Sequence, residues 1–136
     1  MTSLLQYYNE ETKTLSLPYT FNEDLFDIPL GTEKIICIED YNKYEYSMFD
    51  KIIDNLPNSL IDIGCFSHSN IINNIPNFVE YICIYFYNID EYNKEVLNIP
   101  CNIKQIKIND KKKIHFIKKI PFGCIITDFG DNLINI

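Results

Sequence analysis

The chain has 136 residues, enough for one domain that buries a hydrophobic core without disulfides or a structural metal. Its net charge is −7, and all twelve of its basic residues are lysines. This charge would repel phosphate groups, and no arginine is present to contact them with two parallel hydrogen bonds, so we expect no nucleic-acid binding. No stretch reaches the roughly 20 apolar residues that cross a bilayer, and the first residues lack a signal-peptide pattern. We therefore expect a cytoplasmic protein that does not bind membranes.

Residues 1–11 fit no repeat and predict a cap, because an uncapped array of repeats exposes its core. The cap residues would be Leu4, Leu5, Tyr7 and Tyr8. Residues 12–131 hold about six irregular repeats, and residues 132–136 form a short tail. The whole chain, 1–136, is expected to be a single domain.

The repeat is clearest at residues 56–65 and 75–84, which read Leu-Pro-Asn-Ser-Leu-Ile-Asp-Ile-Gly-Cys and Ile-Pro-Asn-Phe-Val-Glu-Tyr-Ile-Cys-Ile. Counted from each proline, apolar residues occupy positions −1, +3, +6 and +8. The same frame recurs around Pro100 and, more loosely, around Pro121 and Pro29. A fixed apolar signature with a period of roughly 20–30 residues is typical of a solenoid.

The three consecutive residues from +6 to +8 of each frame predict a β-strand, because their apolar residues alternate with the period of a strand. Stacked repeats would form a parallel sheet from strands at 15–17, 35–37, 63–65, 82–84, 106–108 and 127–129. In the last copy, the frame assigns Thr127 and Phe129 to the core. The connections predict short helices at 44–55 and 90–98, and turns or 3₁₀ segments elsewhere.

The five cysteines, at positions 37, 65, 83, 101 and 124, are odd in number and contain no Cys-x-x-Cys pair. Cys37, Cys65 and Cys124 fall at apolar frame positions, which predicts buried free thiols in a reducing compartment. A zinc site would need closer ligand spacing and histidine partners, and His68 and His115 each stand alone. We therefore expect neither a metal nor another cofactor; a metal or redox site built from the cysteines is the alternative.

Three segments resemble the FNIP repeats, a branch of the leucine-rich repeats that is abundant in social amoebae and in giant viruses of amoebae. They are Leu-Pro-Asn-Ser-Leu at 56–60, Ile-Pro-Asn-x-Val-x-x-Ile-x-Ile at 75–84 and Phe-Asn-x-x-Leu-x-x-Ile-Pro at 21–29. The resemblance implies an α/β repeat fold, a leucine-rich-repeat-like right-handed solenoid. Its parallel β-sheet would form the concave face, and short helices, 3₁₀ segments or loops the convex face. It also implies a protein–protein interaction module, which in a viral protein would act in the host cytoplasm on a host protein.

Side chains between the frame positions would form three columns on the concave face. The central column would be Ser16, Ile36, Gly64, Cys83, Lys107 and Asp128, flanked on one side by Pro18, Ile38, Phe66, Tyr85, Asn109 and Gly130, and on the other by Thr14, Lys34, Asp62, Tyr81, Gln105 and Ile126. A solvated sheet face would be polar, so an apolar and aromatic patch predicts a contact surface. We expect a partner to bind through Ile36, Ile38, Phe66, Tyr81, Cys83, Tyr85 and Lys107. The alternatives are a homodimer through the same face and a local covering of these residues.

Two residue pairs are candidate catalytic groups. Asp62 and Asp128 could form a carboxylate pair, but in this register they lie three strands apart, or roughly 15 Å, which is too far for shared acid–base chemistry. Cys83 could act as a nucleophile with His68 as its base, but the register places no histidine beside Cys83. We therefore expect a protein that is not an enzyme.

Overall fold

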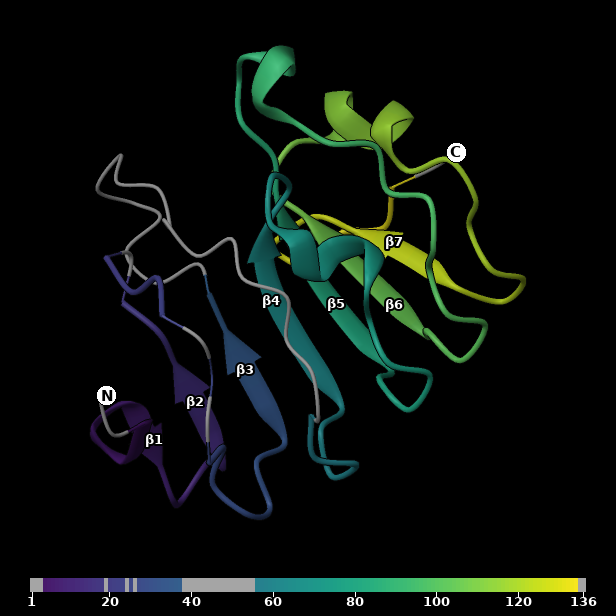
Figure 1. The fold of residues 1–136 in the computed structure, drawn as a ribbon. Helices are drawn as coiled ribbons and strands as arrows, with labels where there is room; N and C mark the ends of the chain where they lie inside the picture. Colours follow the sequence, from purple (N-terminus) through teal and green to yellow (C-terminus); the bar gives the residue numbers. More distant parts are fainter. Residues whose placement is uncertain (1–3, 19, 24, 26, 38–55, 135–136) are drawn as a thin grey trace.

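The computed structural model describes residues 4–18, 20–23, 25, 27–37 and 56–134. These residues form one seven-stranded sheet in which the strands lie in the order of the sequence (Figure 1). The strands are β1 (Tyr8–Asn9), β2 (Thr14–Ser16), β3 (Lys34–Ile36), β4 (Asp62–Phe66), β5 (Tyr81–Tyr85), β6 (Gln105–Ile108) and β7 (Ile125–Thr127). The strand β1 pairs antiparallel with β2, and every later neighbouring pair is parallel. The predicted parallel sheet is therefore confirmed.

The helices in the described part of the chain are short 3₁₀ segments. They are η1 (Leu4–Tyr7), η3 (Asn70–Asn73), η4 (Asp90–Tyr92) and η5 (Lys111–Phe116). The helix predicted at 90–98 is wrong, because only η4 forms there and Val96 then pairs in an extended bridge with Ile117. The helix predicted at 44–55 lies outside the described residues. None of the described helices has the length and apolar character needed to cross a membrane.

Every proline of the chain opens a tight turn, which explains the proline-based frame. The carbonyl oxygen of each accepts a hydrogen bond from the backbone N–H three residues later, at 3.0–3.2 Å. The pairs are Pro18–Phe21, Pro29–Thr32, Pro57–Leu60, Pro76–Val79, Pro100–Ile103 and Pro121–Cys124. Proline favours such turns because its ring fixes φ. Five of these turns lead into a strand, so they set where each strand begins.

The turn before β7 is one residue shorter than the turns before β3, β4, β5 and β6. In each of those four strands, two successive N–H groups donate to one carbonyl of the preceding segment, as Lys104 and Gln105 do to Glu80. Such an extra residue is the mark of a β-bulge. Before β7, Ile125 alone donates to the Lys104 carbonyl. The last strand therefore lies at Ile125–Thr127, and the prediction of 127–129 is wrong by this missing residue.

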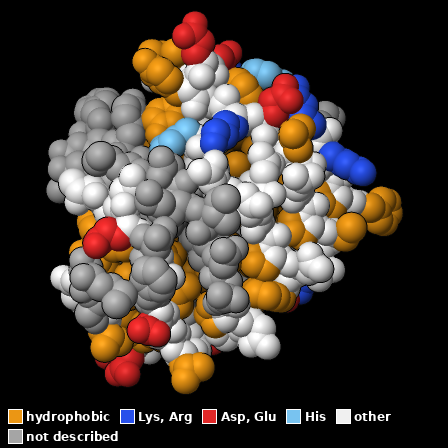
Figure 2. Space-filling model, viewed as in Figure 1, with side chains coloured by type: hydrophobic (Ala, Val, Ile, Leu, Met, Phe, Trp, Pro, Cys, Tyr) orange, Lys and Arg blue, Asp and Glu red, His pale blue; other side chains and the backbone are white. Residues whose placement is uncertain are grey.

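One side of the sheet faces the hydrophobic core. The register aligns one core residue from each of β2 to β7, namely Leu15, Ile35, Ile63, Ile82, Ile106 and Ile126, each at most 1% exposed. The core position in β7 is thus Ile126, whereas Thr127 lies on the opposite side and Phe129 beyond the strand. In the view of Figure 2, hydrophobic side chains reach the described part of the surface only in separate groups.

Two asparagines bond the backbone just after β5 through their side-chain amides, Asn109 from the next repeat and Asn93 from the same connection. Asn109 accepts from the Phe86 N–H at 2.7 Å and donates to the Phe86 carbonyl at 2.9 Å. Asn93 makes the same two bonds to the backbone of Tyr87, at 2.8 and 2.9 Å. The backbone groups that follow β5 are therefore satisfied by side chains rather than by another strand.

The lysine run at 111–113 lies in η5. Asp110 begins this helix by accepting a hydrogen bond from the Lys112 N–H at 3.0 Å. The Lys113 ammonium group bonds Asp90 at 2.5 Å and the Asn88 carbonyl at 2.9 Å, and only 13% of its side chain is exposed. Lys113 thus links η5 to η4, whereas Lys111 and Lys112 are exposed.

Candidate functional site

The candidate site lies on the second face, the side of the sheet opposite the hydrophobic core. The predicted central column is confirmed for its first five positions, which the register aligns as Ser16, Ile36, Gly64, Cys83 and Lys107. Its last member is Thr127 rather than Asp128, and the neighbouring column ends at Ile125 rather than Ile126. Both corrections follow from the residue missing before β7.

An aromatic cluster, formed by Phe66, His68, Tyr85, Tyr87 and Phe129, covers one part of the second face. The ring of Phe66 lies 4.8 Å from that of Tyr85 and 5.4 Å from that of Tyr87. His68 Nδ1 is hydrogen-bonded to the Tyr87 hydroxyl at 2.6 Å. Phe66 is only 1% exposed, so in this structure little of its ring is open to a partner. At this position the alternative of local covering applies, because Phe66 packs between rings of the same chain.

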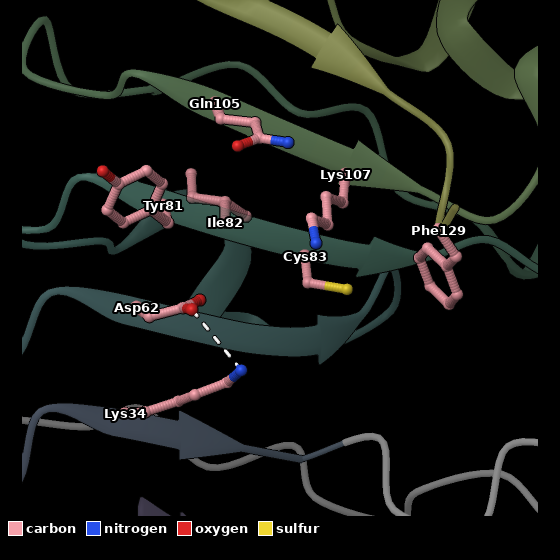
Figure 3. Close-up of a pocket in the computed structure, with 8 residues that line it drawn as sticks. All are labelled: Lys34, Asp62, Tyr81, Ile82, Cys83, Gln105, Lys107 and Phe129. Atoms are coloured by element: carbon pink, nitrogen blue, oxygen red, sulfur yellow. Dashed lines mark ion pairs between the residues drawn. The ribbon is translucent and has the colours of Figure 1, made fainter. Parts of the chain in front are cut away.

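Beside this cluster the second face contains a cavity of about 440 Å³. Its walls come from β3, β4, β5 and β6 and from the residues after β7 (Figure 3). The lining residues are Lys34, Asp62, Tyr81, Ile82, Cys83, Gln105, Lys107 and Phe129. Tyr81 and Gln105 lie at one end of this face cavity and Phe129 at the other, with Cys83 between them (Figure 3).

Two ion pairs carry the charge of the face cavity. Lys34 Nζ lies 3.6 Å from Asp62 Oδ2, and Lys107 Nζ lies 2.9 Å from Asp131 Oδ1. Burial raises the pKa of Asp62, and the positive charges of Lys34 and Lys107 oppose that rise. The hydrogen bond with Asp131 raises the pKa of Lys107, and the same bond lowers the pKa of Asp131. The two lysines and two carboxylates of these pairs have formal charges that sum to zero.

The floor of the face cavity is the thiol of Cys83. Burial raises its pKa to about 12, so it is protonated at neutral pH. An activated cysteine nucleophile shows the opposite shift. All five cysteines are free thiols. Within the described ranges, no three His, Cys, Asp or Glu side chains are arranged to hold a metal ion.

The turn formed by residues 128–133, which we call the closing turn, folds back onto the second face. The Asp128 carboxylate accepts from the N–H groups of Gly130 and Asn132, both at 2.9 Å. The N–H of Asp128 in turn donates to the Asn132 carbonyl at 2.9 Å. After the turn, Leu133 forms an antiparallel bridge with Thr127. The closing turn thereby brings Phe129 and Asp131 back over β5 and β6.

The structure places most of the predicted contact residues together. Ile36, Tyr81, Cys83, Tyr85 and Lys107 are half-buried on the second face. Ile38 lies outside the described residues. The sequence did not predict that Phe129 and Asp131 belong to the site, because no apolar pattern indicates a turn that reverses the chain. Lys34, Asp62 and Gln105 stood in a predicted column but were not among the predicted contact residues.

Comparison with known proteins does not supply a function. Searches of family models, curated proteins and solved structures found no match to the chain. The function is therefore inferred from the chemistry of the second face.

Proposed function

We propose that the sheet is the concave face of a leucine-rich-repeat-like right-handed solenoid related to the FNIP repeats. The chain would then be a non-enzymatic module that binds a protein partner through this face. Support comes from strands that follow one another in sequence order with a turn at each proline. Solenoid proteins present extended binding surfaces of this kind.

The observation that carries the proposal is the face cavity. Its side chains offer a partner an aromatic ring, an amide and a neutral thiol in one depression. Its lysines are each paired with a carboxylate of the same chain, so the empty cavity has no net formal charge. Interfaces gain most of their affinity from a few side chains that fill such pockets, and a cavity of about 440 Å³ holds one or two of them.

The test fills the face cavity without changing the rest of the surface. Cys83→Trp places an indole in the cavity, and Cys101→Trp makes the same substitution at an exposed turn as the matched control. Thermal melts first show that both variants are folded. Quantitative co-purification from cell extract should then find a protein that accompanies the wild type and Cys101→Trp but not Cys83→Trp. The proposal fails if every co-purifying protein is retained equally by both variants.

A homodimer through the same face is the second candidate. The observation that favours it is the zero net charge of the two ion pairs, because two copies of a chain with a charge of −7 can approach through a neutral face. Sedimentation should then show a dimer for the wild type and a monomer for Cys83→Trp. A wild type that stays monomeric across micromolar concentrations eliminates this candidate.

We also propose that the protein works in a reducing compartment, the cytoplasm, or the host cytoplasm if the chain is viral. The support is that all five cysteines are free and that Cys37 and Cys65 are buried side by side in neighbouring strands. Free thiols in this number are typical of proteins that are not exposed to an oxidising environment.

A further inference from the structure

The closing turn contacts the second face through the side chains of Asp131 and Phe129. The Asp131 carboxylate pairs with Lys107 at 2.9 Å and accepts a second, longer bond from Gln105 Nε2 at 3.4 Å. The ring of Phe129 lies 6.3 Å from that of Tyr85 and lines the face cavity (Figure 3). A carboxylate and an aromatic ring, two residues apart, are thus held against the sheet.

Bonds within the closing turn hold this pair in place. The Asp128 carboxylate accepts from two backbone N–H groups and from the side-chain amide of Asn132. Asp131 adopts a φ of 64°, in the left-handed region that non-glycine residues rarely occupy. The turn therefore presents Phe129 and Asp131 at a fixed spacing, as a bound peptide would present two side chains.

Displacing the turn would leave the face cavity with an unpaired positive charge. Without Asp131, the cavity retains two lysines, Lys34 and Lys107, but only one carboxylate, Asp62. Asp62 is already paired with Lys34. Lys107 would then face a half-buried apolar surface without its carboxylate, which favours a new anionic group at that position.

We propose that the face cavity binds an acidic protein segment that carries an aromatic side chain and a carboxylate two residues apart. The closing turn is the internal competitor for this segment. The inference rests on the proposed function and names the chemistry of the partner. A tethered competitor has an effective concentration in the millimolar range, so it suppresses weak ligands and yields only to a matching sequence.

The test uses a fluorescent synthetic peptide, Thr-Asp-Phe-Gly-Asp-Asn-Leu, which copies residues 127–133. Its binding is measured by fluorescence anisotropy to the full-length wild type and to the full-length variant with Phe129→Ala and Asp131→Asn. The double variant lacks the Phe129 ring and the Asp131 charge of the competitor, so we expect its Kd to be at least tenfold lower than that of the wild type. Asp131→Asn alone removes only an exposed carboxylate charge, and it provides an intermediate case if the double variant does not fold.

Two controls test the ion pair between Lys107 and the peptide carboxylate. A peptide with lysine in place of the second aspartate should not bind. Adding Lys107→Gln should abolish the increase in peptide affinity of both variants. Raising the salt concentration should weaken binding, because the pair is partly exposed. Equal affinity of wild type and variants, no binding up to millimolar peptide, or equal binding of the lysine peptide would each overturn the inference.

The two proposals can fail separately. A partner that is lost with Cys83→Trp, combined with no binding of the acidic peptide, leaves the protein-binding face intact and removes the acidic motif. Peptide binding that is blocked by Cys83→Trp, with no partner found in the extract, supports the motif and shows that the natural partner was not in that extract.

Discussion

Ile84 and Tyr85 are neighbours in β5 whose side chains lie on opposite sides of the sheet. Ile84 is fully buried in the core, whereas Tyr85 is half-buried and packs against Phe66 and Phe129. Ile84→Asp should abolish folding, because a carboxylate would be buried without a counter-charge. Tyr85→Asp should leave the protein folded but less stable by about 1–3 kcal/mol, since two ring contacts of about 0.5–1.5 kcal/mol each are lost.

Chemical denaturation of the two variants checks this prediction. The loss in the free energy of unfolding should be smaller for Tyr85→Asp than for Ile84→Asp. If Tyr85→Asp were the variant that fails to fold, the second face would be the true core of the molecule.

Asp128 should make the closing turn sensitive to acid. Hydrogen bonds from the backbone and side chain of Asn132 lower the pKa of Asp128. A carboxyl group whose pKa is lower in the folded state stabilises that state above its unfolded pKa of about 3.9, and this stabilisation is lost as the pH falls through the folded pKa. Asp128→Asn keeps an oxygen acceptor but does not titrate.

The melting temperature of the wild type should therefore exceed that of the Asp128→Asn variant at pH 7, and the difference should shrink below about pH 4. A difference that is constant from pH 7 to pH 2.5 would contradict this role.

The bulge before β6 gives a prediction about a single strand. Deleting Lys104 should leave Gln105 alone to donate to Glu80, which is the arrangement that Ile125 already has before β7. The deletion also removes the ion pair with Glu80, and Ile125 would have to donate to the Ile103 carbonyl in place of that of Lys104. The register of β6 would be kept, and we expect a loss of about 1 kcal/mol, or roughly 3–5 °C in Tm. Deleting Lys107 instead moves Ile108 from the core to the second face, because a shift of one residue moves every later side chain of a strand to the opposite side of the sheet. That variant should not fold, and circular dichroism melts of the two deletions compare them directly.

The sequence predicted the positions of β2 to β6 well because each of these strands follows an apolar frame with one regular spacing. It failed at β7 because the segment from Cys124 to Thr127 is apolar or neutral at every position. Such a segment fits either register equally well. Only the count of hydrogen bonds to the preceding segment shows that the bulge residue is absent.

The site was predicted less completely than the sheet. Alternation within strands identified which residues leave the core, and this holds for Tyr81, Cys83 and Lys107. It cannot show which of them are covered by residues outside the strands, as Phe66 is by Tyr87. Nor does it reveal a turn that depends on a left-handed aspartate, as the one at Asp131 does.

At the scale of the whole molecule, each strand in the described part of the chain pairs only with its neighbours in the sequence. Ile82→Ala removes a core side chain that is 1% exposed and should cost about 2–5 kcal/mol. The loss should appear mainly in β4, β5 and β6, with little change in β2, because coupling in such an array passes from neighbour to neighbour. Hydrogen exchange resolved by strand measures this gradient. Equal loss of protection in all strands would show that the sheet opens as one cooperative unit.

The sequence order of the strands also determines how the molecule would respond to mechanical force. Tension applied at the two ends of the sheet would load one strand pair at a time, because the seven described strands lie side by side in the order of the sequence. Each strand that detaches would release one connection of about 20–28 residues, or roughly 7–10 nm of extended chain. Such a protein would lengthen under load in small successive steps instead of unfolding in a single event. When the load falls, it would refold from the strands that remain paired.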